Sequence, residues 1–117
     1  MLTPDAAARF ADEWIAAWNS HDLDRILAHW AEDCVFTSPL AAQLLGTTGI
    51  VRGKAELRTY WQRGLAANPG LRFSLEQVLV GADSLVISYR NHRQQTCAEF
   101  LRLDHTGHAV EGAAHYA

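Results

Sequence analysis

Apolar side chains spaced three and four residues apart predict helices in the first part of the chain. Thr3 can cap a first helix, whose first turn suits Pro4 and Asp5, and the helix is predicted to run to about Trp18. A second helix is predicted from residue 22 to residue 30, and a third from about residue 54 to residue 67. Their inward faces are formed by Leu23, Ile26, Leu27 and Trp30, and by Leu57, Tyr60, Trp61 and Leu65.

Segments rich in β-branched and aromatic residues predict strands elsewhere. A short strand over residues 34–37 should end at Ser38 and Pro39, because proline cannot continue a hydrogen-bonded ladder. Four segments, at residues 71–80, 84–91, 96–103 and 109–116, predict an antiparallel meander. Three helices followed by such a meander predict an α+β fold in which the helices cover one face of a curved sheet.

The segment from Leu40 to Gly53 is predicted to be a long loop. It is apolar and contains glycine, and loops of this length in compact domains often act as lids or binding loops. The sequence leaves open whether this loop is a lid. No repeat, linker or low-complexity segment interrupts the chain, so residues 1–117 are expected to form a single domain.

The charge pattern argues against two classes of partner. The formal charge is −3 and the basic residues form no run, so binding to nucleic acid is not expected. No apolar stretch approaches the roughly 18–20 residues of a membrane span, and the first residues do not resemble a signal peptide. We therefore expect a cytoplasmic protein with no membrane contact.

Metals and cofactors are also not expected. Cys34 and Cys97 do not have the spacing of a zinc site and are interpreted as buried, reduced side chains with no disulfide between them. The six histidines include no HExxH motif. The glycine-containing segment at residues 49–54 does not have the spacing of a phosphate-binding loop, so a nucleotide is not expected either.

Several stretches, in this order and spacing, carry a resemblance to a known family. They are residues 18–23 (WNSHDL), 30–36 (WAEDCVF), 51–57 (VRGKAEL) and 103–107 (LDHTG), with 114–116 (AHY) at the end. Over nearly the whole chain the sequence resembles the nuclear transport factor 2-like superfamily, and within it the SnoaL-like domain. The resemblance implies a cone-shaped α+β barrel with a pocket between the helices and the concave sheet, and a homodimer formed through the convex sheet face. It implies no single reaction, because this fold serves isomerases, cyclases, hydrolases and binding proteins.

Ketosteroid isomerase, a member of this superfamily, gives a template for site residues. By motif, its base position falls on Ser38, its first oxyanion donor on Trp14 and its neutral acid on Glu99. Two further aromatic positions fall on Trp30 and Trp61. An indole donates hydrogen bonds but does not accept them, and Ser38 could not remove a proton without a base. Steroid isomerisation is therefore not expected, and of the three template positions only Glu99 keeps a carboxyl group.

The direction of Glu99 depends on strand register. Alternation over residues 96–103 places Cys97, Glu99 and Leu101 on the more apolar face, directed toward the pocket. A shift of one residue would instead make Glu99 a surface carboxylate. Two other acid or base candidates are Asp33, which more often would end a helix at the surface, and a pair formed by Arg102 and Asp104 that resembles the epoxide hydrolases of this fold.

Aromatic side chains are the candidate ligand contacts. The predicted pocket wall consists of Trp14, Trp18, Trp30, Tyr60, Trp61 and Tyr116. The alternative is that the tryptophans simply fill the core, although a buried indole N–H usually has a hydrogen-bond partner.

Two functions remain open. The first is a pocket protein that binds a small apolar molecule without catalysis. The second is an isomerase, cyclase or hydrolase that uses Glu99 as acid or base, with Trp14 or Ser38 positioning the substrate. Loss of the template's base slightly favours the first. The convex sheet face, with Val78, Ala98, Phe100 and Ala113 assigned to it, is the expected dimer interface.

Overall fold

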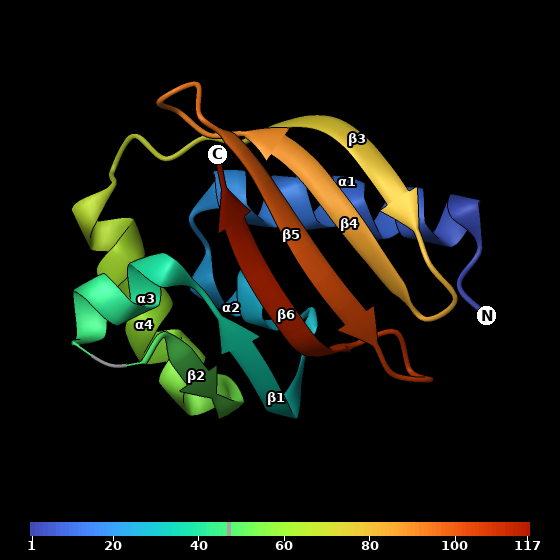
Figure 1. Ribbon diagram of the computed structural model, residues 1–117, viewed down its shortest axis with the longest axis horizontal. Helices are drawn as coiled ribbons and strands as arrows, with labels where there is room; N and C mark the ends of the chain where they lie inside the picture. Colours follow the sequence, from blue (N-terminus) through green and yellow to red (C-terminus); the bar gives the residue numbers. More distant parts are fainter. Residues whose placement is uncertain (47) are drawn as a thin grey trace.

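The structure, a computed structural model, describes residues 1–46 and 48–117. Within this part of the chain, helices pack on a six-stranded sheet, with α1 lying across the face of the sheet that is turned away from the viewer in Figure 1. The elements in chain order are α1 (Pro4–Ser20), α2 (Leu23–Leu27), β1 (Trp30–Thr37), α3 (Pro39–Leu45), β2 (Ile50–Arg52), α4 (Gly53–Ala67), β3 (Ser74–Val80), β4 (Ser84–Arg90), β5 (Thr96–Leu103) and β6 (Ala109–Tyr116). The predicted α+β fold is confirmed, with four helices where three were predicted.

The first helix has the ends that its sequence predicts. The Thr3 hydroxyl accepts a hydrogen bond from the Ala6 N–H at 3.1 Å, and Pro4 occupies the first turn. His21, in the left-handed conformation with φ of 59°, ends the helix and donates its N–H to the Trp18 carbonyl. One face of α1 therefore presents Trp14 and Trp18 to the sheet.

The second helix is shorter than predicted. It ends at Leu27, and Trp30, expected on its inward face, instead begins β1. Trp30 pairs with Ala109 of β6, and the Ala109 N–H donates to the His29 carbonyl at 2.8 Å. Ile26 and Trp30 are four residues apart, so both point inward whether or not the helix continues, and the periodicity could not distinguish the two structures.

The prediction of a loop from Leu40 to Gly53 is wrong for much of its length, since α3 and β2 lie within it. Ser38 caps α3, with its hydroxyl accepting from the Leu40 N–H at 3.2 Å, and Pro39 fills the first turn. Gly46 ends α3 with φ of 65°. Ser38 and Pro39 thus start a helix as well as end a strand. Residue 47 of the predicted loop lies outside the described residues.

The sheet contains the predicted meander, the predicted short strand as the second half of a longer β1, and β2, which was not predicted. Its order is β2-β1-β6-β5-β4-β3, in which β3 to β6 pair antiparallel and β1 pairs parallel to β6. The first meander strand starts at Ser74 instead of Leu71. The backbone of residues 71–73 forms hydrogen bonds to the end of α1 instead of to a strand. The Asn19 side chain donates to the Phe73 carbonyl and accepts from the Phe73 N–H, and the His21 ring is hydrogen-bonded to the Leu71 carbonyl.

One residue assigned to the outer sheet face lies on the other face. Val78 pairs with Ile87, which pairs with the inward-facing Glu99, so Val78 faces the helices. A bulge in β3 between Leu75 and Gln77 shifts the alternation that the sequence suggested. Its place on the outer face is taken by Leu79, in a cross-strand row that continues through Val86, Phe100 and Ala113.

Candidate functional site

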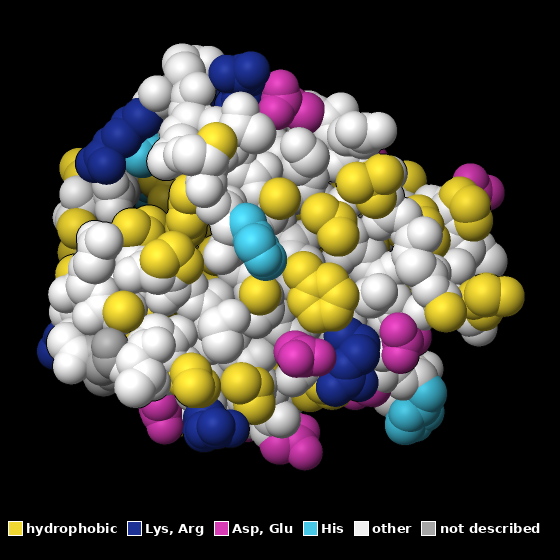
Figure 2. All heavy atoms as spheres, viewed as in Figure 1, with side chains coloured by type: hydrophobic (Ala, Val, Ile, Leu, Met, Phe, Trp, Pro, Cys, Tyr) yellow, Lys and Arg dark blue, Asp and Glu magenta, His cyan; other side chains and the backbone are white. Residues whose placement is uncertain are grey.

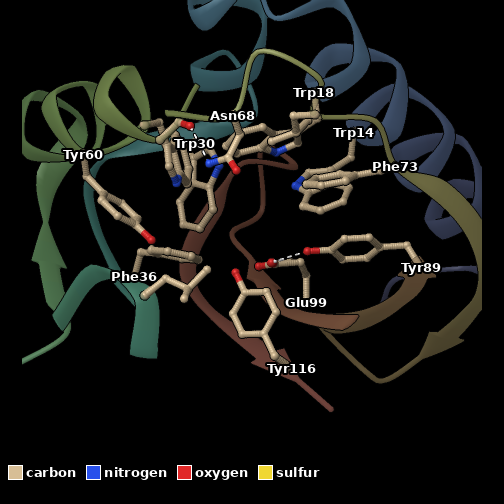
Figure 3. Close-up of a pocket in the computed structure, with 14 residues that line it drawn as sticks. Trp14, Trp18, Trp30, Phe36, Tyr60, Asn68, Phe73, Tyr89, Glu99 and Tyr116 are labelled. Atoms are coloured by element: carbon tan, nitrogen blue, oxygen red, sulfur yellow. Dashed lines mark hydrogen bonds between the residues drawn. The ribbon is translucent and has the colours of Figure 1, made fainter. Parts of the chain in front are cut away.

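An aromatic-walled cavity of about 110 Å³, called the chamber below, lies between α1, α4 and the inner sheet face. In Figure 3, Glu99 and Tyr116 project from the sheet, and Trp14 and Trp18 face them from α1. A cavity of this size accommodates a small ring or several water molecules. The lining residues are Trp14, Trp18, Trp30, Phe36, Leu40, Tyr60, Trp61, Gly64, Asn68, Leu71, Phe73, Tyr89, Glu99 and Tyr116.

All six aromatic residues expected to contact a ligand lie in this wall. The rings of the four tryptophans pack edge to face or tilted against one another, as in the contact between Trp18 and Trp61, whose ring centroids are 5.1 Å apart at an interplanar angle of 80°. The tryptophans therefore do both things considered for them: they fill the core and they form the surface of a cavity.

Glu99 is the carboxyl group of the chamber. It is 5% exposed and alternates with exposed or half-buried neighbours along β5, so the predicted inward register is confirmed. Its cross-strand neighbours are the apolar Ile87 and Ala114. The Tyr89 hydroxyl donates a hydrogen bond to Glu99 Oε1 at 3.0 Å.

Burial raises the pKa of Glu99 to about 8, although the hydrogen bond from Tyr89 acts in the opposite direction. At neutral pH the side chain is therefore mostly a neutral carboxylic acid. With one oxygen accepting from Tyr89, the acid has an O–H to donate to a molecule in the chamber.

Tyr89 and Phe73 are site residues that the sequence analysis missed. The Tyr89 and Phe73 rings are tilted against each other with centroids 4.4 Å apart, and the Phe73 ring stacks on Trp14 at a centroid distance of 5.7 Å. Burial, followed by the nearby Glu99 carboxyl, raises the pKa of the Tyr89 hydroxyl, so Tyr89 remains a donor. The alternation of Leu85, Ile87 and Tyr89 on β4 was a signal that could have found Tyr89. Phe73 lies outside any strand, and no periodicity marks it.

Ser38 does not line the chamber. It is 4% exposed, caps α3, and its hydroxyl receives a hydrogen bond from the Tyr60 hydroxyl at 3.4 Å. Burial raises the pKa of both Tyr60 and Tyr116, so these two phenols are also neutral donors. Ser38 thus supports one side of the wall, and among residues 1–46 and 48–117 its hydroxyl has no hydrogen-bond partner that could act as a base.

The indole nitrogens add to the donor character of the wall. Figure 3 shows the Trp14 nitrogen directed toward the cavity. The indole N–H groups of Trp18 and Trp30 are buried and have no hydrogen-bond partner among residues 1–46 and 48–117. Since an indole only donates, and a neutral acid and phenols also present O–H groups, the wall is suited to a ligand with an accepting oxygen.

A wider hollow of about 550 Å³, called the vestibule below, adjoins the chamber. The two cavities adjoin each other along eight shared lining residues, which are Leu40, Tyr60, Gly64, Asn68, Leu71, Phe73, Tyr89 and Tyr116. The part of the vestibule wall that the chamber lacks is more polar and is formed by Gln43, Leu44, Ala67, Asn91, His92, Arg93, Gln95 and Cys97.

The other acid or base candidates line neither the chamber nor the vestibule. Asp33 is exposed on β1. Arg102 pairs with Glu111 on the outer face at 3.1 Å, while Asp104 accepts hydrogen bonds from Thr106 and His108 in a turn. Arg102 and Asp104 therefore have separate partners.

No three side chains among His, Cys, Asp and Glu gather in a metal-binding arrangement within the described ranges. Cys34 and Cys97 are both buried free thiols. None of the described helices combines the length and apolar character needed to cross a membrane.

The sequence model of a family described as SnoaL-like domain matches residues 11–117. A SnoaL-like protein of unknown function from Burkholderia thailandensis is 38% identical, with a TM-score of 0.94 over 100% of this chain and 99% of that one. An NTF2-like protein of unknown function from Burkholderia pseudomallei is 18% identical, with a TM-score of 0.76 over 95% and 90%. TerC, co-crystallised with polyporic acid, is 16% identical, with a TM-score of 0.77 over 98% and 92%. No curated protein matches the chain significantly.

Proposed function

The chain belongs to the SnoaL-like domain family, and on this basis we propose that it binds a small, mainly apolar molecule carrying a hydrogen-bond-accepting oxygen. The apolar part of the ligand packs against the aromatic wall of the chamber, and its oxygen accepts from the Glu99 carboxyl group. Large apolar walls with a few placed polar groups are typical of small-molecule sites. TerC, which has the same fold, was co-crystallised with polyporic acid.

The observation that carries this proposal is the state of Glu99. A buried carboxyl group costs free energy unless it is neutral or well paired. Glu99 has one hydrogen bond within the described chain, from Tyr89, and its pKa is raised to about 8. A ligand carbonyl or ether oxygen gives the remaining O–H an acceptor.

A second candidate function is an isomerase that uses Glu99 as both base and acid. The observation in its favour is the same raised pKa, because a group that titrates near neutral pH can both take and return a proton. The ionised carboxylate would remove a proton from a carbon next to a carbonyl and return it at another carbon, with Trp14 as a donor to the carbonyl oxygen. No other carboxyl group lines the chamber among the described residues, so cyclase or hydrolase mechanisms that require a carboxyl pair receive less support.

Binding can be tested with acetonaphthone, an aryl ketone, and ethylnaphthalene, which has the same ring but no oxygen. The indole N–H signals of the four tryptophans in NMR spectra report on the chamber wall. At pH 6.5 we expect the ketone to bind roughly 2- to 10-fold more tightly than the hydrocarbon, the ratio that one net hydrogen bond supplies. Equal affinities for the two probes would contradict the proposal.

Variants assign the effect to Glu99. Glu99→Leu removes the donor and should abolish the preference for the ketone, whereas Glu99→Gln keeps a donor and should retain it. In the wild type the preference should fall as the pH rises through about 8, and in Glu99→Gln it should not. Glu32→Gln, at an exposed position of β1, is the matched control and should behave as the wild type. The proton removal that begins an isomerisation would appear separately, as exchange of the ketone's α-hydrogens for solvent deuterium that is lost in Glu99→Gln.

A further inference from the structure

The vestibule wall carries a cationic side chain, Arg93, that forms no ion pair within the described part of the chain. We propose that Arg93 binds the carboxylate of an amphipathic ligand whose apolar ring lies in the chamber. This inference rests on the proposed function, and it makes the ligand class an aryl or alkyl ketone with an acidic tail. It concerns the vestibule, whose wall does not include Glu99 or the tryptophans.

The chamber and the vestibule meet at Asn68, which contacts Arg93. Asn68 lines both the chamber and the vestibule, and the Arg93 Nη2 group donates to Asn68 Oδ1 at 3.2 Å. Asn68 is itself fixed, because its amide group donates to the Gly64 carbonyl at 2.9 Å. A ligand that leaves the chamber past Asn68 therefore meets the guanidinium group.

Arg93 is held by an ordered turn between β4 and β5. The Asn91 side-chain oxygen accepts from the N–H groups of Arg93 and Gln95, each at 3.0 Å. The Gln94 N–H donates to the Asn91 carbonyl, and Gln94 adopts φ of 62°. Since the turn is fixed by its own hydrogen bonds, the base of the arginine side chain is positioned before any ligand binds, which lowers the entropic cost of binding.

The charge around Arg93 favours an anion. Among the described residues of the vestibule wall, Arg93 is the single Lys or Arg, and there is no Asp or Glu. No carboxylate of the described chain lies within ion-pair distance of its guanidinium group, whereas Arg25, Arg58, Arg90 and Arg102 all have acidic partners. Figure 2 shows arginine and histidine side chains gathered beside a hollow with hydrophobic side chains, at the upper left of the molecule.

Two details favour a carboxylate as the anion. The guanidinium group has five N–H donors in a planar fork that matches a carboxylate, and one of them is used by Asn68. The His92 ring lies beside it in the vestibule wall, with its Nδ1 atom buried and without a partner in the described part of the chain. One arginine with neutral amide neighbours suits a singly charged group, whereas a phosphate monoester normally requires more donors.

The test uses naphthoylpropionate, a naphthyl ketone with a short chain ending in a carboxylate, and its neutral methyl ester. Affinities are measured at pH 6.5 and low salt from the tryptophan indole signals. Because Arg93 is exposed, the wild type should bind the acid roughly 2- to 5-fold more tightly than the ester, the ratio expected for an ion pair in contact with solvent, and added salt should reduce this ratio. Arg93→Gln should reduce the ratio to about one and leave the affinity for the ester unchanged.

Arg63→Gln is the matched control, because Arg63 is exposed on α4 and does not line the vestibule. It removes the same charge and should keep the preference for the acid. Equal binding of acid and ester by the wild type, or a preference for the acid that survives Arg93→Gln, would overturn the inference. Binding of the ester would still support the proposed function in either case. Binding of acetonaphthone without binding of either longer probe would also overturn it. If no ketone binds, including acetonaphthone, the proposed function and this inference both fail.

Discussion

The environment of Glu99 explains why its carboxyl group remains protonated near neutral pH. Ile87 and Ala114 flank it across the neighbouring strands, and the tryptophans of α1 cover it from the opposite side. Water is largely excluded, so the charged form loses its hydration, and one hydrogen bond from Tyr89 does not compensate for this loss.

This state makes stability depend on pH in a defined direction. In the unfolded chain Glu99 ionises near 4.5, whereas in the folded chain it keeps its proton up to about 8. Between these values the folded state binds more protons, so its stability decreases as the pH rises. Glu99→Gln should lack this decrease. Urea unfolding at pH 5, 6.5 and 8 measures the difference between the two proteins.

The comparison with Glu99→Gln also removes a competing effect. Burial lowers the pKa of His29, so its contribution makes the folded state more stable as the pH rises toward 6.5. His29 is present in both proteins, and its effect cancels in the difference. A wild type whose stability follows that of Glu99→Gln across this range would mean that Glu99 is ionised in the folded protein.

At the scale of the elements, the packing of the Trp30 ring from β1 against β6 depends on a glycine. A Cβ atom at Gly112 would lie within 2.4 Å of the Trp30 ring and 3.3 Å of Phe36. Both neighbours are rigid aromatic rings of the chamber wall, so they cannot simply move aside. Gly112 therefore leaves the space into which Trp30 packs.

Gly112→Ala should destabilise the protein by about 1–3 kcal/mol, the usual cost of overpacking a core. Gly64→Ala is the control, because a Cβ atom there meets nothing within 4 Å and alanine favours the interior of α4. That substitution should stabilise by ~0.5–1 kcal/mol. Both changes are measured as shifts in the free energy of unfolding in urea, and a neutral Gly112→Ala would show that the wall adjusts easily.

The sequence predicted elements well where one pattern had one interpretation. The strands at residues 96–103 and 109–116 have the predicted bounds, and the alternation of β5 correctly directs Glu99 inward. Prediction from the sequence failed where one residue belongs to two elements, as Ser38 does in ending β1 and capping α3. It also failed at Val78, where a bulge reverses the alternation, and at Tyr89, whose partnership with Glu99 depends on strand pairing.

At the scale of the molecule, the outer sheet face remains the proposed interface of a homodimer. Leu79, Val86, Phe100 and Ala113 form an apolar row across β3 to β6 on the side that α1 does not cover. Figure 2 views this face, where hydrophobic side chains lie over the central strands with a histidine and charged side chains beside them, and the ion pair of Arg102 and Glu111 spans β5 and β6. Contiguous apolar surface of this kind is typical of interaction sites.

Sedimentation analysis at micromolar concentration should therefore show a dimer. Phe100→Asp places a charge in the middle of the apolar row and should produce monomers, because a charge in the core of an interface is poorly tolerated. Leu44→Asp alters a similarly exposed leucine on α3, outside the row, and should leave the dimer intact. A wild-type monomer, or a dimer that Phe100→Asp does not affect, would contradict the proposed interface.

The protonation state of Glu99, with and without a ligand, tests the central claim most directly. NMR of protein labelled with carbon-13 at glutamate, assigned by comparison with Glu99→Gln, follows this carboxyl group as the pH is changed. We predict a midpoint near 8 in the free protein. The midpoint should move higher when acetonaphthone is bound, because a ligand that accepts from the neutral acid stabilises it. A midpoint in the ordinary range of an exposed glutamate, unchanged by the ketone, would contradict the account.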